Sequence, residues 1–454
     1  MSQHLSAALQ HARENRDEVL IELRDLLTIP SVSDNPVHDG DVRRAAEWLL
    51  TRLQGLGPDR AQIIETAGHP VVFAELLSAN PSAPTVLLYG HYDVQAVEPL
   101  DAWETDPFTP TIHGYNLYAR GSSDDKGQIM AMIAAVEAAK AVGPLPVSIK
   151  FMLEGEEEVG SPSLGECLKA HRGEFACNLV LNTDAGMLGE NTPTLVYGLR
   201  GMSRFVLRVT GPTNDLHSGG YGGVVHNPIH ALCELIAGMH DDEGRVRFPG
   251  FYDSVRELPE EERETFKNLP LDDQAFLDES GAPALWGEPG FTPLERQGAR
   301  PALDVIQITA GSPKAAIPVF AEALCTIRLA PCQDPAEVRK QVEAHLEKVA
   351  PPTIRWEIVD YSGFPATLTE LDKPGVKELM DAYRTVWGVE PAYYPSGGSI
   401  GAVGQILEIL GAHSLLTGFS LPGDHIHGPN EKLHLPTWEK GIQALVHFLY
   451  NLGA

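Results

Sequence analysis

The sequence predicts an α/β protein in which a three-layer domain is interrupted by an inserted α+β domain. Short apolar runs typical of buried strands alternate with amphipathic helical patterns over residues 1–199, and this alternation resumes near the C-terminus. The segment between them has a different character, and a chain of 454 residues is too long for one small core. We therefore expect one domain from residues 1–199 and 366–454, with residues 200–365 inserted into it.

Each helix and strand of the first domain is predicted from the spacing of its apolar residues. Helical spacing predicts helices over residues 13–28, 41–56, 128–141, 373–387, 400–411 and 437–452. Short apolar runs predict strands over residues 71–77, 85–89, 147–153, 179–181, 392–394 and 414–417. Strands and helices that alternate in this way form a sheet with helices on its faces, and sites in such sheets lie beyond the carboxyl ends of the strands.

The inserted segment is predicted to mix strands and helices. Strands are expected over residues 205–210 and 321–329, with a helix over residues 227–240 between them. Residues 241–300 are polar, rich in Pro and Glu, and contain short helical patches. This order of elements indicates an α+β domain.

Charge and composition exclude several classes of protein. The formal net charge is −28 and the isoelectric point about 4.9, and no cluster of Lys and Arg is long enough to bind nucleic acid or an anionic membrane. No apolar run approaches the ~18 residues of a membrane helix, and the polar N-terminus contains no secretory signal. The five cysteines are an odd set without CxxC spacing. We therefore expect a cytoplasmic protein with reduced cysteines and with neither nucleic acid nor a membrane as a partner.

The most informative motif follows the strand predicted over residues 85–89. It reads Gly90-His91-Tyr92-Asp93-Val94-Gln95. His91 and Asp93 are two residues apart on extended backbone, so their side chains point the same way. A histidine with a carboxylate beside it, just past the end of a strand, is typical of a metal ligand and the group that orients it. Taken alone, the pair could equally be a turn histidine beside a solvated aspartate.

Four further clusters of oxygen and nitrogen ligands lie elsewhere in the chain. They contain Asp124, the run Glu156-Glu157-Glu158, Asp184, and the segment Asp424-His425-Ile426-His427-Gly428-Pro429-Asn430-Glu431. Imidazole and carboxylate ligands without thiolate suit Zn²⁺, Mn²⁺ or Co²⁺. One metal ion needs about three protein ligands, and two ions that share a carboxylate need about five. Two histidines and three carboxylates of these clusters supply that number.

In combination, the motifs resemble the metallopeptidase family typified by carnosinase, cytosolic nonspecific dipeptidase, glutamate carboxypeptidase and the amino-acid deacylases. The resemblance covers nearly the whole chain. It rests on the HxD motif at His91, the D-x-K-G motif at Asp124, the E-E-x-G-S motif at Glu157 and the H-x-x-N-E-K motif at His427. The long polar stretch 241–300 resembles the dipeptidase branch, in which the lid is larger.

The resemblance implies a metal-dependent hydrolase that cleaves the amide bond of dipeptides or short peptides. It implies two divalent metal ions, with Zn²⁺ favoured over Mn²⁺ or Co²⁺, in an α/β catalytic domain. The inserted domain is implied to be the lid and to form a homodimer. Asp124 is implied to bridge both ions, with His91 and Asp184 on one and Glu158 and His427 on the other.

Two more residues are implied to act beside the ligands. Asp93 orients the histidine of the HxD motif, and Glu157 is the general base that takes a proton from a metal-activated water. The register of the acidic run leaves Glu156 as an alternative base if the spacing is counted from Glu154. Otherwise Glu154, Glu156 and Asp125 are expected to be exposed acidic residues of turns.

The resemblance also implies residues that bind the substrate. Asp215-Leu216-His217-Ser218-Gly219 resembles the lid motif of the family, whose histidine polarises the scissile carbonyl, often across a dimer interface. Arg328 matches the arginine that holds the C-terminal carboxylate of the substrate, a task that suits a guanidinium fork. Gly398 and Ser399 lie in a segment that resembles the substrate loop. By themselves, His217 could be a loop histidine and Arg328 a surface arginine.

Three other functions are compatible with parts of the sequence. The segment Gly397-Gly398-Ser399-Ile400-Gly401 fits the G-x-S-x-G elbow of a serine hydrolase, and Asp424 and His427 follow in triad order. However, these two residues are only three positions apart, and the remaining ligand motifs would be left unexplained. A non-enzymatic relative would be expected to lack the base or a ligand. An N-acyl-amino-acid deacylase of the same family is harder to separate from a dipeptidase, although its lid is typically shorter.

Overall fold

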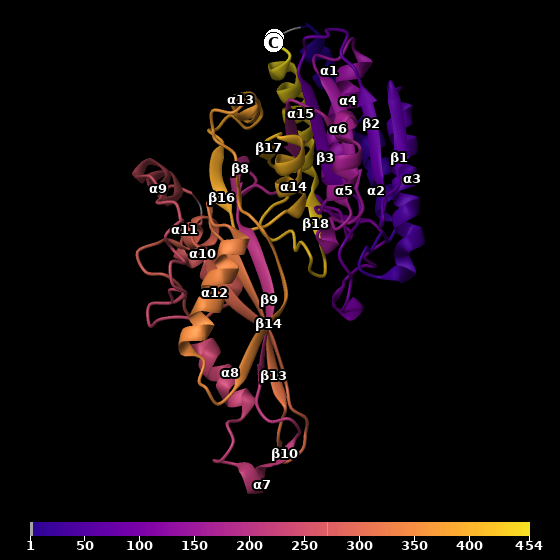
Figure 1. Cartoon of the computed structure of the whole chain (residues 1–454). Helices are drawn as coiled ribbons and strands as arrows, with labels where there is room; N and C mark the ends of the chain where they lie inside the picture. Colours follow the sequence, from indigo (N-terminus) through magenta and orange to yellow (C-terminus); the bar gives the residue numbers. More distant parts are fainter. Residues whose placement is uncertain (1–2, 270) are drawn as a thin grey trace. The chain divides into compact units, whose positions relative to one another are not determined.

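The computed structural model describes residues 3–269 and 271–454. The chain forms two compact units, which Figure 1 shows coloured along the sequence. The first unit contains the chain up to Tyr197 together with Thr369–Tyr394 and Ile400–Ala454. The second unit contains Gly198–Leu368 and Pro395–Ser399. No helix among the described residues is long and apolar enough to cross a membrane.

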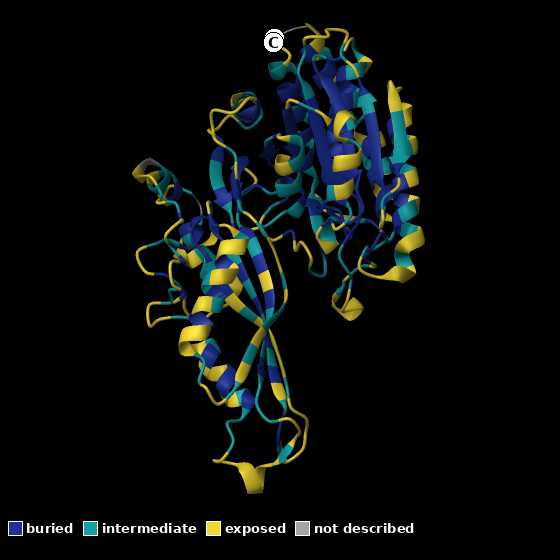
Figure 2. Ribbon diagram, in the orientation of Figure 1, coloured by how far each residue is buried: buried dark blue, intermediate teal, exposed yellow. Residues whose placement is uncertain are grey.

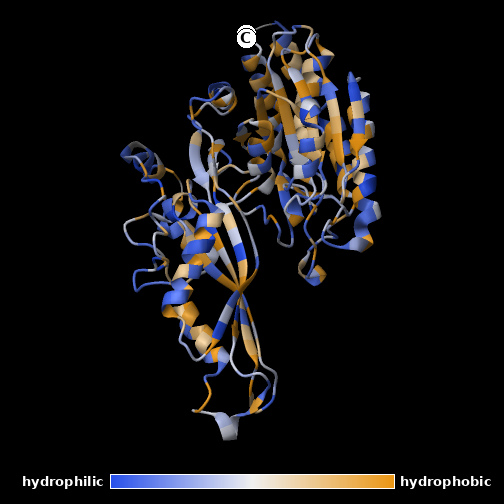
Figure 3. Ribbon diagram, in the orientation of Figure 1, coloured by the Kyte–Doolittle hydropathy of each residue, from blue (hydrophilic) through white to orange (hydrophobic). Residues whose placement is uncertain are grey.

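A mixed sheet, parallel in its middle and antiparallel toward both ends, forms the centre of the first unit. Its strands, in spatial order, are β1 (Arg60–Ile64), β2 (Val71–Leu76), β6 (Ser148–Glu154), β3 (Thr85–His91), β7 (Leu179–Asn182), β17 (Ser414–Leu416), β8 (Thr194–Leu199) and β15 (Thr367–Leu368), and β16 (Ala392–Ser396) also pairs with β8. The four strands β6, β3, β7 and β17 are parallel to one another, so their carboxyl ends lie at one edge of the sheet. Parallel sheets are covered on both faces, and these strands are accordingly apolar and buried (Figures 2 and 3).

The sheet separates two hydrophobic cores, because successive side chains of a strand point to opposite faces. Val86 and Leu88 of β3 pack in one core, whereas Leu87 and Tyr89 pack in the other. The first core includes residues of α1 (Gln3–Glu14), α2 (Arg16–Leu27), α3 (Asp39–Gly55), α4 (Lys126–Ala141), α13 (Val376–Trp387) and α15 (Leu435–Leu452). The second core includes residues of α5 (Leu164–Ala170), α6 (Arg172–Phe175) and α14 (Gly401–Leu410). The first unit is therefore a three-layer α/β domain, which confirms the predicted fold class.

A small three-stranded sheet joins two segments of the first unit that are far apart in the sequence. Its central strand β5 (Asn116–Tyr118) pairs with β4 (Thr111–His113) and β18 (Lys432–His434). The β5 strand comes just before the segment with Asp124, and β18 comes just after the loop with His427. Their pairing brings the two segments together.

The second unit contains an antiparallel sheet with two helices packed on it. The strands, in spatial order, are β11 (Ala302–Ala310), β13 (Phe320–Leu329), β9 (Gly201–Thr210) and β14 (Arg355–Phe364). Phe205 and Leu207 of β9 face the core, whereas Arg204 is exposed. The helices packed on this sheet are α8 (Pro228–Ala237) and α12 (Pro335–Val349). The shorter elements are β10 (Leu216–His217), α7 (Ser218–Tyr221), α9 (Glu260–Lys267), α10 (Asp273–Ser280), α11 (Pro293–Ala299), β12 (Ala316–Ile317) and β15 (Thr367–Leu368).

Most predicted elements are present, and the differences have physical causes. The helix predicted over residues 13–28 is α2, whereas α1 was not expected, because only three of its side chains are buried: Leu5, Ala8 and Leu9. The strands β11 and β14 were not expected. Both lie at the edges of their sheet, where few side chains are buried and the apolar pattern is weak.

Helix α15 lies so close to Phe419 that Gly441 has room only for a hydrogen. A Cβ atom added there would lie 2.5 Å from the ring. We expect Gly441→Ala to lower the free energy of unfolding by about 1–3 kcal/mol, the usual cost of overpacking a core. Gly40 in α3 is the control, because a Cβ atom there meets nothing within 4 Å, and Gly40→Ala should stabilise the helix by about 0.5–1 kcal/mol. Urea unfolding followed by circular dichroism measures both, and equal stability of the two variants would contradict the packing described.

Candidate metal centre

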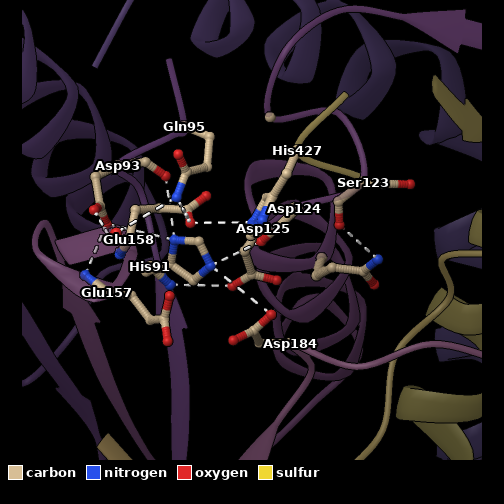
Figure 4. A network of polar contacts seen from close by, with 12 residues as sticks. His91, Asp93, Gln95, Ser123, Asp124, Asp125, Glu157, Glu158, Asp184 and His427 are labelled. Atoms are coloured by element: carbon tan, nitrogen blue, oxygen red, sulfur yellow. Dashed lines mark hydrogen bonds and ion pairs between the residues drawn. The ribbon is translucent and has the colours of Figure 1, made fainter. Parts of the chain in front are cut away.

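His91 is the last residue of β3 and is completely buried. Its Nε2 atom lies 2.9 Å from Oδ1 of Asp124 and 3.9 Å from Oδ1 of Asp184. On the other side of the ring, Nδ1 lies 3.4 Å from Oδ1 of Asp93. The backbone N–H of His91 donates a hydrogen bond to Asp125 (3.0 Å). Asp93 and Asp125 therefore hold the ring and the main chain so that Nε2 points at Asp124 (Figure 4).

Asp124 lies between two imidazoles. Its Oδ1 contacts His91, and its Oδ2 lies 2.9 Å from Nε2 of His427. The same nitrogen of His427 lies 3.1 Å from Oε2 of Glu158. Burial favours the neutral form of Asp124, yet the hydrogen bonds with His427 and His91 outweigh burial and lower its pKa. One carboxylate thus contacts one histidine through each oxygen, which is the arrangement that a bridging ligand requires.

The loop that carries His427 has an unusual backbone. His425, His427 and Asn430 have φ angles of 57°, 62° and 63°, in the left-handed region that residues other than glycine rarely adopt. Such conformations cost about 1–3 kcal/mol each and are concentrated at functional sites. The side chain of His427 is 52% exposed. The cluster is therefore open to solvent on the side of this loop.

Glu157 and Glu158 lie in a short turn just after β6, and Asp93 fixes that turn. The carboxylate of Asp93 accepts hydrogen bonds from the backbone N–H of Glu157 (3.2 Å) and of Glu158 (3.1 Å). The side chain of Gln95 donates to Oε2 of Glu158 (3.0 Å). Asp93 thus orients both the imidazole of His91 and the acidic turn.

Mutual repulsion and burial perturb the acidic groups of the cluster. Burial raises the pKa of Glu157 well above its ordinary value, and the neighbouring Asp184 raises it further. Burial also raises the pKa of Asp184 to about 6, against the opposing effect of the nearby imidazole. Hydrogen bonds with Asp124 and Glu158 raise the pKa of His427 to about 10. The cluster therefore concentrates negative charge, which positive charge at its centre would stabilise.

The donor set fits divalent metal ions. Ligand atoms of His91, Asp124 and Glu158 lie within 4.8 Å of one another, and so do those of His91, Glu157 and Asp184. The Oε1 atom of Glu158 is buried and has no hydrogen-bond partner among the described residues. A buried carboxylate oxygen without a partner is costly, and coordination would satisfy it. Imidazole and carboxylate ligands together match Zn²⁺, Mn²⁺ or Co²⁺.

Two acidic residues that we expected to be exposed, Glu154 and Asp125, are buried. Glu154 accepts hydrogen bonds from the hydroxyls of Tyr89 (2.7 Å) and Ser161 (2.9 Å), and Asp125 accepts the backbone N–H at the end of β3. The expectation was wrong because these partners come from other segments of the chain. These carboxylates hold the frame of the site together.

Glu156 is also buried, against expectation, and its carboxylate is engaged away from the cluster. It accepts hydrogen bonds from the backbone N–H of His69 (3.0 Å) and of Ser163 (3.1 Å). Glu157, in contrast, shares a group of ligand atoms with His91. This difference favours Glu157 over Glu156 as the acidic residue that faces the centre.

Glu431 is completely buried, and the motifs predicted no role for it. Its Oε1 accepts hydrogen bonds from the backbone N–H of Ser123 (2.9 Å) and of Asp124 (3.1 Å). Its Oε2 accepts from the backbone N–H of Gly121 (3.0 Å) and from the guanidinium of Arg120 (2.7 Å). Glu431 therefore sets the loop that carries the central carboxylate. In the sequence, Glu431 was marked only as part of the segment 424–431 and of the H-x-x-N-E-K motif.

The remaining predicted site residues, His217, Arg328, Gly398 and Ser399, belong to the second unit. His217 lies on β10 and is exposed. On β13, the guanidinium of Arg328 donates a hydrogen bond to the hydroxyl of Ser399 (2.7 Å). The carbonyl of Gly398 accepts from the backbone N–H of Arg200 (3.1 Å). Arg328, Gly398 and Ser399 thus form one group.

The catalytic triad of a serine hydrolase is not formed. The hydroxyl of Ser399 donates to the backbone carbonyl of Arg200 (2.7 Å). The carboxylate of Asp424 accepts a hydrogen bond from the ammonium group of Lys432 (2.6 Å). Among the residues that the structure describes, Asp424 and His427 are not joined by a hydrogen bond. This arrangement contradicts the serine-hydrolase interpretation.

A cluster of imidazole and carboxylate groups at the carboxyl ends of parallel strands, with an acidic residue facing it, defines a metal-dependent hydrolase. Residues 87–451 match the model of Peptidase family M20/M25/M40. The chain belongs to this family, which confirms the resemblance predicted from the motifs.

Similar proteins extend along the whole chain. Human Beta-Ala-His dipeptidase is 31% identical over 99% of this chain and 93% of its own length. Cys-Gly metallodipeptidase dug1 of Schizosaccharomyces pombe is 28% identical over 97% of both chains. The crystal structure of human carnosine dipeptidase 1 is 29% identical, covers 100% of this chain and 99% of its own, and superposes with a TM-score of 0.84.

Because Glu431 orients the loop of Asp124, we expect Glu431→Gln to weaken metal binding by about 10–100-fold, the usual effect of changing a residue that supports a ligand. The amide offers one acceptor oxygen in place of two and loses the negative charge that Arg120 faces. Metal competition with a chromophoric chelator measures the affinity. Glu288→Gln is the control, because Glu288 is likewise buried and paired with an arginine, Arg300 (2.8 Å), but lies in the second unit. Equal metal affinity in the two variants would contradict the role of Glu431.

Proposed function

We propose that the protein is a dinuclear metal-dependent dipeptidase. The observation that carries the proposal is Asp124, whose two oxygens contact His91 and His427 within a buried set of hard ligands. The relatives with full-length matches are named as dipeptidases of β-Ala-His and Cys-Gly. These names favour a dipeptidase over the N-acyl-amino-acid deacylase alternative.

The proposed ligands are the five residues identified from the motifs. Asp124 would hold both ions, and the contacts of Asp124 with His91 and with His427 support this assignment. We assign Asp184 to the ion of His91, and Glu158 to the ion of His427. When bound, divalent cations would lower the pKa of a water molecule and stabilise negative charge on the oxygen of the scissile amide. We propose Zn²⁺ as the native metal, with Mn²⁺ or Co²⁺ as alternatives.

The protein's own residues would perform the proton transfers. Glu157 would take a proton from the attacking water and deliver it to the leaving nitrogen. Its raised pKa suits a group that must hold the proton between these two steps. Asp93 would keep the imidazole of His91 in one orientation and the turn of Glu157 in place, so that neither group has to reorganise during the reaction.

We further propose that residues of the second unit bind the substrate. Arg328 would bind the C-terminal carboxylate, with Ser399 and Gly398 beside it, and His217 would donate a hydrogen bond to the amide oxygen. The hydrogen bond between Arg328 and Ser399 supports a common task for these two residues.

A homodimer formed through the second unit completes the proposal. The edge strand β11 exposes Ile306 (60%) and Ile308 (51%) beside an unpaired backbone edge, and such strands tend to pair with another chain. The five cysteines are free, as expected for a protein of the reducing cytoplasm, where we propose it acts.

Removal of metal should abolish hydrolysis of dipeptides. The enzyme, stripped by chelation and dialysed, should not cleave Ala-Ala, and added Zn²⁺ or Mn²⁺ should restore cleavage, because the reaction needs an activated water. A panel of dipeptides and N-acetyl amino acids, followed by detection of free amine, measures the activity. Full activity after chelation would contradict the proposal, and faster cleavage of N-acetyl amino acids would support the deacylase instead.

Glu157→Gln should lower kcat by about 10²–10⁴-fold, the usual contribution of a general base, while metal content stays the same. Glu156→Gln is the matched control, since that carboxylate is bonded to the backbone of His69 and Ser163. Steady-state kinetics and metal analysis compare the two. A large loss in the Glu156 variant together with an active Glu157 variant would show that the base is misassigned.

A further inference from the structure

Arg200 follows β8 at the start of the second unit and is attached to the loop of residues 397–399. Its backbone N–H donates to the carbonyl of Gly398 (3.1 Å), and its backbone carbonyl accepts from the hydroxyl of Ser399 (2.7 Å). Its side chain Nε donates to the carbonyl of Gly397 (3.2 Å). One residue therefore makes hydrogen bonds to three successive residues of this loop.

These contacts orient Ser399 toward Arg328. Because the hydroxyl hydrogen of Ser399 is used in the bond to the carbonyl of Arg200, the oxygen of Ser399 presents its lone pairs elsewhere. One of them accepts the hydrogen bond from Nη1 of Arg328 (2.7 Å). Arg200, Ser399 and Arg328 are thus joined in one chain of hydrogen bonds.

The side chain of Arg200 is also packed in place. A Cβ atom added at Gly397 would lie 3.2 Å from Nη2 of Arg200, so the guanidinium lies directly against this loop. The same Cβ atom would lie 2.4 Å from Cγ of Gln297, so a side chain at position 397 would not fit. Arg200 is half-buried, as is Arg328. The guanidinium has little freedom to turn away into solvent.

Two positive charges stand together here without an ion pair. Among the described residues, neither Arg200 nor Arg328 forms a salt bridge with a carboxylate, although acidic residues outnumber Lys and Arg by 62 to 34. Burial, and then the charge of Arg328, lower the pKa of Arg200 to about 10, against a weaker opposing effect of the exposed Asp304. Such a pair of like charges is costly unless an anion is present between or beside them.

We propose that Arg200 is a positioning residue of the carboxylate-binding site: it holds the loop of residues 397–399 and adds a second positive charge beside Arg328. The site would therefore select peptides that end in a free carboxylate over peptides that end in an amide. This inference rests on the proposed function, in which Arg328 binds the C-terminal carboxylate of the substrate.

The test compares Ala-Ala with Ala-Ala-amide on the full-length, metal-loaded enzyme. Arg200→Gln should raise the KM for Ala-Ala about tenfold, as expected when a partly screened charge is lost near an anion. Its kcat should change by less than about twofold, because the group does not touch the reacting atoms. The KM for Ala-Ala-amide should stay the same. Arg200→Lys, which keeps the charge but loses the planar fork, should recover most of the affinity for Ala-Ala.

Arg204→Gln is the control, because Arg204 is an exposed residue of the neighbouring strand β9. This substitution removes the same charge as Arg200→Gln. Its KM should equal that of the wild type for both peptides. Thermal denaturation shows whether Arg200→Gln is folded. If it is not, the test is made with Arg200→Lys, by comparing its KM for Ala-Ala with its KM for Ala-Ala-amide.

Equal increases in KM for the acid and the amide, or a Lys variant that loses carboxylate selectivity, would overturn the inference and leave Arg200 with a structural role only. Failure of the wild type to cleave Ala-Ala would instead refute the proposed function itself. The two failures are therefore distinguishable.

Discussion

The structure of the site depends on one buried carboxylate that faces two imidazoles. Asp124 contacts His91 and His427 at 2.9 Å each, and three further acidic side chains lie around the same centre. Carboxylates brought together out of water repel one another, and the free energy of that arrangement is favourable only if positive charge is present. Divalent cations would supply that charge more densely than protons on two histidines. This requirement explains why the cluster offers nitrogen and oxygen atoms that are held in place by their neighbours.

In this fold, one set of residues forms the cluster and a second set holds the segments of the first in place. Three parallel strands bring ligand-bearing segments to one edge of the sheet, and the pairing of β5 with β18 joins the loops of Asp124 and His427. Behind the ligands, Asp93, Asp125 and Glu431 accept backbone N–H groups from the segments that carry them. These buried carboxylates fix main-chain positions around the cluster.

The sequence predicted the residues that form the cluster but not their surroundings. The strands that end at His91 and before Asp184 are short apolar runs, so these elements and the positions of the two residues at strand ends followed from periodicity and from the rule for strand ends. The motifs with Asp124, Glu158 and His427 needed the family resemblance. The burial of Glu154, Glu156 and Asp125 could not be predicted, because each is buried only through partners from distant segments, such as Tyr89 for Glu154. The contacts of Arg200 could not be predicted for the same reason, because its partner Gly397 lies 197 positions away in the sequence.

The central claim is that two cations share Asp124, and anomalous X-ray diffraction from crystals grown with Zn²⁺ tests it most directly. Data collected on either side of the zinc absorption edge locate the ions without reference to activity. The account predicts two anomalous peaks on opposite sides of the Asp124 carboxylate, one beside His91 and one beside His427, at ligand distances of about 2 Å. A single ion that does not contact Asp124, or no peak within the cluster, would contradict it.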